Sequence, residues 1–273
     1  MITYKRDYDK TYDATIKTLL REYNTQYSNN PEYDCVYLYR FDQNRLTGAL
    51  TVDYFWNWAG VKAFYYEDRD TLDALVQEAS AYYKDKAMGM KFYTPSLKHR
   101  DDFVSVGFTN LSTYTYPDGT PFYFVDRPSL SDRGAPTTGV ERHFEPQRPL
   151  ETLVEKHMAS YRKTFQITAP VGTFDVAALH GDACVGGIQC EISTDAMYIS
   201  RIAVDKAYRN NRIGSTLINK AIDHARRLNL KTIDLGTCEF QGRPFYEKFG
   251  FKVIHTREDN PKGYKNYTMI KEL

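Results

Sequence analysis

A weak internal duplication constrains this chain more than any other feature of its sequence. Segment 245–251 reads Phe-Tyr-Glu-Lys-Phe-Gly-Phe, and the much earlier segment 102–108 reads Asp-Phe-Val-Ser-Val-Gly-Phe. The two Gly-Phe pairs lie half a chain length apart, and each precedes a strand pattern, a polar turn and a second strand pattern. A duplicated chain of 273 residues predicts two related domains, each long enough to bury its own core.

The segment between the two copies has the composition of a linker. Residues 127–136 read Arg-Pro-Ser-Leu-Ser-Asp-Arg-Gly-Ala-Pro, which is rich in Pro, Ser and Gly and has no hydrophobic periodicity. We therefore predict one domain over residues 1–130 and a second over residues 131–273.

Both halves mix helix and strand patterns. In the second half the expected elements are, in order, strand 139–144, helix 150–165, a hairpin of 174–179 and 184–192, strand 197–204, helix 213–228, strand 232–235, short helix 243–248, and strands 251–255 and 267–270. In the first half they are strands 35–41, 46–55 and 61–66 and helix 71–84. The predicted fold class is α/β (α+β).

Composition excludes several classes of function. Lys and Arg number 36 against 35 Asp and Glu, so the net charge of +1 argues against a nucleic-acid binder or a polybasic membrane-surface protein. No apolar run approaches the roughly 18 residues of a membrane helix, and the start has no secretory apolar stretch. The four cysteines lack CxxC spacing and the six histidines lack ligand spacing. We therefore expect free thiols, a cytoplasmic location and no metal site.

The segment 202–215 joins a strand pattern to an amphipathic helix and has the features of an anion site. The first turn of a helix offers unpaired N–H groups and the positive end of the helix dipole. The loop adds two guanidinium groups, two asparagines that tolerate left-handed backbone, a glycine that allows close approach and a hydroxyl donor: Arg209, Arg212, Asn210, Asn211, Gly214 and Ser215. A phosphate or pyrophosphate is the expected ligand, and a solvated turn before a surface helix is the alternative.

Together, this loop and the 245–251 motif resemble the acyl-CoA-binding core of the GNAT superfamily of N-acetyltransferases. That family's phosphate loop has the form Arg/Gln-x-x-Gly-x-Gly/Ala, and segment 209–214 matches its first and last positions but has Arg212 at the first glycine. The second motif matches at Tyr246 and at the final Gly-Phe, whereas Glu239 and Gly242 stand where the family usually has asparagine and alanine. The resemblance is close over residues 138–273 and covers 1–127 only in outline.

The resemblance implies two GNAT-like domains, each a mixed, mostly antiparallel central sheet flanked by helices. It implies direct transfer of an acetyl group from the co-substrate acetyl-CoA to a primary amine of a small-molecule or peptide acceptor, in a ternary complex. It also implies backbone pairing of the pantetheine arm and an oxyanion donor from strand 202–204, and a tyrosine that protonates the leaving thiolate. The implied acyl-CoA contacts are Ile202, Ala203, Val204, Arg209, Asn210, Asn211, Arg212, Ile213, Gly214, Ser215 and Tyr246.

The base that removes the amine proton is less narrowly defined. Glu239, just after a short strand, is the predicted base, with Glu191 in the hairpin and a water chain as alternatives. Cys238 would offer a covalent route, but no histidine stands in a motif that would activate it. A free cysteine of this kind is usually a buried apolar residue.

The first half has an acidic segment where the second half has its phosphate loop. Glu67, Asp68 and Asp70 would repel a pyrophosphate, so we expect a degenerate copy that does not bind CoA and serves as a structural partner or part of the acceptor cleft. Residues 150–172 are expected to select the acceptor, and the resemblance allows a homodimer. A non-catalytic acyl-CoA-binding or scaffold protein is the alternative function, motivated by Arg212 and the missing asparagine.

Overall fold

The computed structural model describes residues 1–6, 11–28, 33–130, 139–146, 172–193 and 195–273. The chain forms two compact units: unit 1 contains residues 1–29, 167–259 and 263–273, and unit 2 contains residues 30–166 and 260–262. Each unit is built on one mostly antiparallel sheet flanked by helices, which confirms the predicted mixed α/β class.

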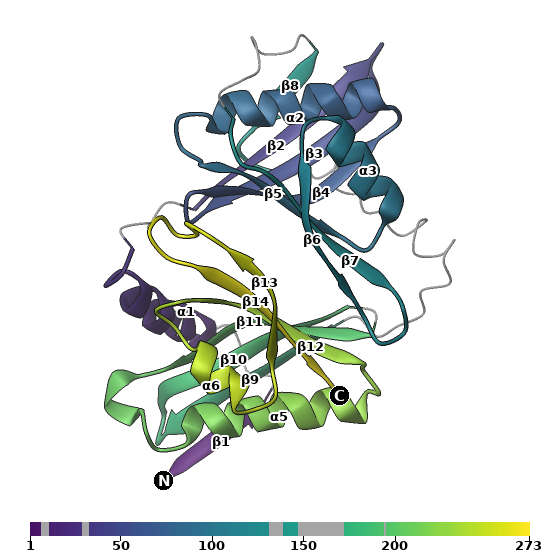
Figure 1. Cartoon of the computed structure of the whole chain (residues 1–273). Helices are drawn as coiled ribbons and strands as arrows, with labels where there is room; N and C mark the ends of the chain where they lie inside the picture. The colour runs from purple at the N-terminus through teal and green to yellow at the C-terminus, as the bar shows by residue number, and fades with distance from the viewer. Residues whose placement is uncertain (7–10, 29–32, 131–138, 147–171, 194) are drawn as a thin grey trace. The chain divides into compact units, whose positions relative to one another are not determined.

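Unit 1 is built on a seven-stranded sheet with the order β1-β9-β10-β11-β12-β14-β13 (Figure 1). Its strands are β1 (Ile2–Arg6), β9 (Gly172–His180), β10 (Ala183–Ser193), β11 (Ala196–Val204), β12 (Thr232–Cys238), β13 (Lys252–Arg257) and β14 (Asn266–Glu272). Its helices are α1 (Thr11–Asn24), the 3-10 turn η1 (Lys206–Tyr208), α5 (Ile213–Arg227) and α6 (Arg243–Glu247). Strands β11 and β12 are parallel, and all the other neighbours in this sheet are antiparallel.

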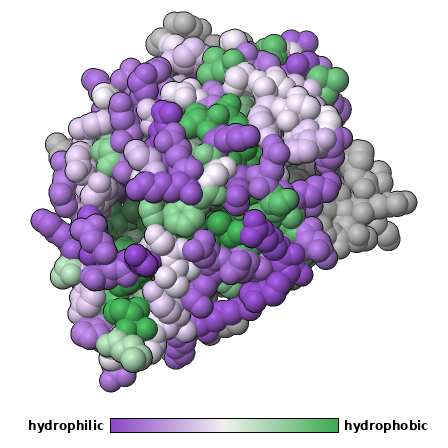
Figure 2. Space-filling view, turned by 60° about the horizontal axis from the view of Figure 1, so that its bottom comes forward, coloured by the Kyte–Doolittle hydropathy of each residue, from purple (hydrophilic) through white to green (hydrophobic). Residues whose placement is uncertain are grey.

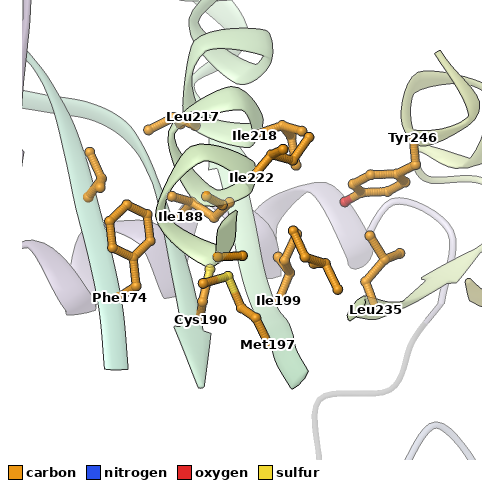
Figure 3. Close-up of a cluster of buried hydrophobic side chains, with 14 of the residues drawn as sticks. Phe174, Ile188, Cys190, Met197, Ile199, Leu217, Ile218, Ile222, Leu235 and Tyr246 are labelled. Atoms are coloured by element: carbon orange, nitrogen blue, oxygen red, sulfur yellow. The ribbon is translucent and has the colours of Figure 1, made fainter. Parts of the chain in front are cut away.

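Helices cover both faces of the unit 1 sheet because its strands alternate their side chains between the faces. On one face Ile188 and Cys190 of β10 belong to the core that contains the apolar side of α5, as Figure 3 shows. On the other face α1 packs against β10 and β11. Ile16 of α1 is fully buried there against Gly187, and Asp13 accepts a hydrogen bond from Gln189.

Unit 2 is built on a second seven-stranded sheet, with the order β6-β7-β5-β4-β3-β2-β8. Its strands are β2 (Asp34–Asp42), β3 (Arg45–Phe55), β4 (Trp58–Tyr66), β5 (Gly89–Thr94), β6 (Thr109–Thr115), β7 (Pro121–Arg127) and β8 (Val140–His143). Helix α2 (Arg69–Tyr83) packs its apolar side into the core of this unit, to which Phe103 of α3 (Leu97–Ser105) also belongs. The parallel pair in this sheet is β4 with β5.

The two sheets have the same strand order, but each takes its edge strand from the far side of the linker. Strand β1, at the N-terminus, pairs with β9 in unit 1, and β8, which follows the linker, pairs with β2 in unit 2. The structure thus divides the chain differently from the predicted boundary near residue 130. The strand predicted at 139–144 is confirmed as β8, but β8 belongs to the sheet of unit 2 rather than to the sheet of the second predicted domain.

Most other predicted elements are present within one or two residues. Helix α5 occupies 213–227 where 213–228 was predicted, and the hairpin of β9 and β10 turns at Gly181 and Asp182 as expected. Strand β1 and helix α1 were not predicted at all. The predicted helix 150–165, and most of the predicted linker, lie outside the described residues.

Among the described residues, no helix has both the length and the apolar character needed to cross a bilayer. Figure 2 shows one face of the molecule, on which hydrophobic side chains form small patches interrupted by polar ones.

Candidate functional site

The sheet of unit 1 opens between its two parallel strands. The pairing of β11 with β12 ends at Ile199 and Leu235, although β11 continues to Val204 and β12 to Cys238. On its other edge β11 stays paired with β10, but a β-bulge at Ser200 interrupts the register there. Because a bulge bends and twists its strand, it accounts for the divergence of β11 from β12. Residues 200–204 therefore present one unpaired backbone edge to the opening.

The turn after β11 leads into α5 with two residues in left-handed backbone. These residues are Asn210, at φ 64°, and Arg212, at φ 61°. Of the two asparagines expected to tolerate left-handed backbone, Asn210 adopts it, whereas the side-chain amide of Asn211 donates to the carbonyls of Tyr208 and Arg209, at 3.2 and 3.3 Å. A left-handed residue is most easily a glycine, which explains why the phosphate-loop pattern has a glycine at the position where this chain has Arg212.

The N-terminus of α5 is open to a ligand. Arg212 is its N-cap residue, and within the described chain no side chain caps the first turn. A Cβ on Gly214 would stand 3.4 Å from Cζ of Phe245, so the glycine leaves just enough room for one carbon. Unpaired N–H groups beside exposed guanidinium groups form a site for an anion.

Arg209 connects this turn to the N-terminal helix. Its Nε–H donates to the carbonyl oxygen of Val204 at 3.1 Å, and its guanidinium carbon lies 4.9 Å from the ring centroid of Tyr23 in α1. The Tyr23 hydroxyl donates to the carbonyl of Phe240 at 2.6 Å, and the Gln241 amide donates to Asn24 at 2.8 Å. Helix α1 therefore supports both sides of the opening, a role that the sequence did not reveal.

Tyr246 lies on α6 with its side chain only 8% exposed. A Cβ on Gly242 would stand 3.0 Å from Cε2 of Tyr246, so the ring packs directly on this glycine. Burial, and to a smaller extent the nearby Tyr198, raise the pKa of the Tyr246 hydroxyl. Figure 3 shows this hydroxyl pointing from α6 toward the part of the core where Ile199 and Leu235 lie, the last pair before the strands separate. Among the described residues no hydrogen bond to it is found.

The two predicted bases lie at different places in unit 1. Glu239 is exposed just beyond β12, where its carboxylate accepts from the N–H of Lys265 at 3.3 Å. Glu191 is exposed on β10, where it is the register partner of Tyr198. Cys238 is buried and its Sγ accepts from Asn266 at 3.3 Å, consistent with the packing role expected of it.

Asp234 of β12 is the titratable residue that sequence reasoning missed. Burial raises the pKa of its carboxyl from 3.8 to about 7. Its register partner across the parallel pair is Tyr198, one step before the strands separate. The available signal was the strand pattern Thr-Ile-Asp-Leu-Gly-Thr-Cys, which puts Asp234 on the face opposite Ile233 and Leu235.

The corresponding region of unit 2 is filled by side chains. Strands β4 and β5 also separate after a short parallel pairing, beyond Gly60 and Lys91. There the Phe64 ring packs at 5.2 Å from Phe92 and 5.4 Å from Phe103. The Tyr66 hydroxyl donates to Asp102 of α3 at 2.6 Å.

The N-terminus of α2 in unit 2 is closed by its own acidic residues. The carboxylate of Asp68 accepts from the N–H of Thr71 at 2.7 Å, and Glu67 pairs with Arg45. The N–H groups that α5 leaves open in unit 1 are thus partly satisfied by a carboxylate in unit 2, which also repels anions.

No cluster of three or more His, Cys, Asp or Glu with metal-binding geometry occurs in the part of the chain that the structure describes. The features that the structure brings together in unit 1 are an open strand edge, a helix N-terminus and a buried phenol.

Comparison with known proteins finds similarity to acetyltransferases. Residues 139–251 match the Acetyltransferase (GNAT) family. It is 33% identical over 105 residues to a probable N-acetyltransferase camello of Xenopus tropicalis, covering 37% of this chain and 47% of the relative. It is 27% identical over 89 residues to a blasticidin-S acetyltransferase of Streptomyces morookaense, covering 32% of this chain and 65% of the relative.

The chain thus spans about half of the first curated relative and just under two thirds of the second. Among solved structures, an acetyltransferase from Bacillus cereus is 22% identical with a TM-score of 0.44, covering 48% of this chain and 97% of the other.

Proposed function

We propose that this protein is an N-acetyltransferase that moves an acetyl group from acetyl-CoA to a primary amine of an acceptor. The observation that carries the proposal is the opening between β11 and β12, which leads directly to the uncapped N-terminus of α5. An extended pantetheine arm fits an unpaired strand edge, and a pyrophosphate fits a helix N-terminus. Together these features match the two parts of CoA.

The residues of unit 1 divide between binding and chemistry. The backbone of Ile202, Ala203 and Val204 would pair with the pantetheine arm and donate one N–H to the acetyl oxygen. The N–H groups of Ile213, Gly214 and Ser215 would hold the phosphates, with Arg209 and Arg212 adding charge and Asn210 and Asn211 shaping the turn.

Tyr246 would protonate the departing thiolate, because its hydroxyl is buried, protonated at neutral pH and without a partner among the described residues. Unit 2 would not bind CoA, because aromatic rings fill its opening and Asp68 caps its helix.

The binding site is tested by titration calorimetry of acetyl-CoA into the purified chain. We expect one site per chain, and Gly214→Trp should abolish binding, because an indole there would overlap Phe245 and cover the N–H groups. The matched control is Asn219→Trp, an exposed position on the same helix, which should bind like the wild type. Two sites per chain, or unchanged affinity of Gly214→Trp, would refute the assignment.

Activity is tested by CoA release with a panel of amines: a polyamine, an aminoglycoside and peptides with a free α-amine or a lysine. Turnover with any of them supports transfer. Binding of acetyl-CoA with no CoA release above background would favour the alternative of a non-catalytic acyl-CoA-binding protein.

A further inference from the structure

The two sides of the opening carry different side chains because the strands alternate across the sheet. On the α5 side, Ile199 of β11 and Leu235 of β12 belong to the core, and Tyr246 reaches the same region from α6. Tyr198 and Asp234 therefore point to the opposite face, which is the face covered further along by α1.

On that opposite face the Tyr198 hydroxyl lies over the point where the strands separate. A Cβ added to Gly236 would find only this oxygen within 4 Å, at 3.9 Å, so the Tyr198 side chain leans across from β11 to β12. Gly236 follows Asp234 by two residues on the same face. Beside the Asp234 carboxyl, on the side of the opening, β12 therefore presents a glycine instead of a larger side chain, and the phenol of Tyr198 from β11 lies over it.

The Asp234 carboxyl is half-buried, and apart from a hydrogen bond with its own backbone it has no hydrogen bond or ion pair with the described residues. Its neighbours on this face are Tyr198 on β11, with Glu191 one strand further, and the uncharged Ile270 and Thr268 on β14. On β13, His255 and Lys252 lie beyond β14. With no cation among its adjacent described residues, burial dominates and favours the protonated carboxyl, whose pKa of about 7 suits proton transfer near neutral pH.

We infer that Asp234 accepts the proton of the attacking amine, with Tyr198 as the group that positions the amine at the opening. This inference rests on the proposed acetyl transfer and deepens it. It places the proton acceptor and the proton donor on opposite faces of the sheet, so that the acceptor amine enters from one face while the sulfur leaves toward the other.

The proton balance of the step closes within these groups. Asp234 takes one proton from the ammonium form of the acceptor, and the amine nitrogen then bonds to the acetyl carbonyl carbon. The carbon–sulfur bond breaks, and Tyr246 donates its proton to the sulfur. The Tyr246 oxygen is reprotonated by the remaining excess proton of the nitrogen, and Asp234 releases its proton to solvent. The products are an amide, free CoA and one proton.

The test is the pH dependence of CoA release between pH 5 and pH 9, with the fastest amine of the panel as acceptor. The wild type should rise in kcat/KM with pH and level off above about 7. Asp234→Asn should lose this rise and fall in kcat by about 100-fold, while its affinity for acetyl-CoA stays within twofold. Tyr198→Phe should raise KM for the amine more than it lowers kcat. The control is Asp223→Asn, an exposed position on α5, which should keep the wild-type profile.

Two results would overturn the inference: an Asp234→Asn variant that binds acetyl-CoA and keeps both its rate within threefold and its pH rise, or loss of that rise in Glu239→Gln instead. A wild-type protein that releases no CoA above background would refute the proposed function itself, and this inference with it. Acetyl-CoA binding is measured on every variant, so a misfolded Asp234→Asn would be recognised. In that case Asp234→Glu is compared with the wild type, and we expect its kcat/KM still to rise with pH.

Discussion

Helix α1 offers the sharpest test of how the chain is divided into its two units. Ile16 is 0% exposed and lies on Gly187 of β10, so Ile16→Ala removes three carbons from a site closed on all sides. Such truncations cost about 2–5 kcal/mol of unfolding free energy. With a urea dependence of about 2 kcal/mol per molar, the unfolding midpoint of unit 1 should fall by about 1–2.5 M.

The two tryptophans allow the units to be followed separately. Trp56 and Trp58 are both buried in unit 2, so tryptophan fluorescence reports on that unit, whereas far-UV circular dichroism and acetyl-CoA binding include unit 1. Ile16→Ala should lower the midpoint by circular dichroism and weaken acetyl-CoA binding, with the fluorescence midpoint shifted far less. The exposed Glu22→Ala on the same helix is the control and should change the free energy by less than about 0.5 kcal/mol.

A double-mutant cycle tests the contact itself. A Cβ at Gly187 would overlap Cδ1 of Ile16 and approach the Val176 carbonyl oxygen to 2.8 Å, so Gly187→Ala alone should cost about 1–3 kcal/mol. Ile16→Ala removes the first overlap but leaves the second. The double variant should therefore be more stable, by about 1 kcal/mol, than the summed effects of the two single substitutions predict. Strict additivity, or a fluorescence transition that shifts as much as the circular dichroism, would refute the packing of α1 on β10.

Two further predictions concern the opening. Tyr246→Phe should lower the rate of CoA release by about 100-fold at unchanged acetyl-CoA affinity, and a rate unaffected by this change would exclude the phenol as proton donor. Because the folded pKa of Asp234 is raised from 3.8 to about 7, the stability contribution of its protonation is present at low pH and is lost as the pH rises through 7. In urea denaturation, the free energy of unfolding of Asp234→Asn should therefore rise relative to that of the wild type by up to about 3 kcal/mol between pH 5 and pH 8. Unfolding free energies that depend equally on pH in the two proteins would contradict this.

Local patterns predicted the elements of the site because they depend on near neighbours in the chain. The apolar face of α5 and the turn at 209–214 follow from side-chain spacing and from the conformations that Asn and Gly tolerate. The contrast between the basic turn of unit 1 and the acidic residues 67–70 of unit 2 could also be seen in the sequence, and the structure adds that Asp68 caps its own helix. The roles of Tyr246 and of the strand edge 202–204 remain predictions.

Other features depend on which strands meet, and short patterns do not encode that. Strands β1 and β8 are brief edge segments with little to distinguish their partners, so the sequence suggested two consecutive domains, whereas pairing puts each strand in the unit across the linker. In the sequence Asp234 is one polar residue of a strand pattern, because its neighbour Tyr198 comes from β11, which precedes helix α5 in the chain, and because its burial depends on the folded chain.

The sequence by itself thus determined the fold class, the site-bearing loop and the family resemblance, since these rest on spacing within a few turns of helix or strand. Only the tertiary structure decided that β1 joins the sheet of unit 1 and α1 packs on that sheet, that the sheet opens at Ser200, and that the Asp234 carboxyl lies beside the opening. The physical reason is that side-chain burial and strand partnership are set by contacts between segments far apart in the chain, and those contacts decide pKa values and packing.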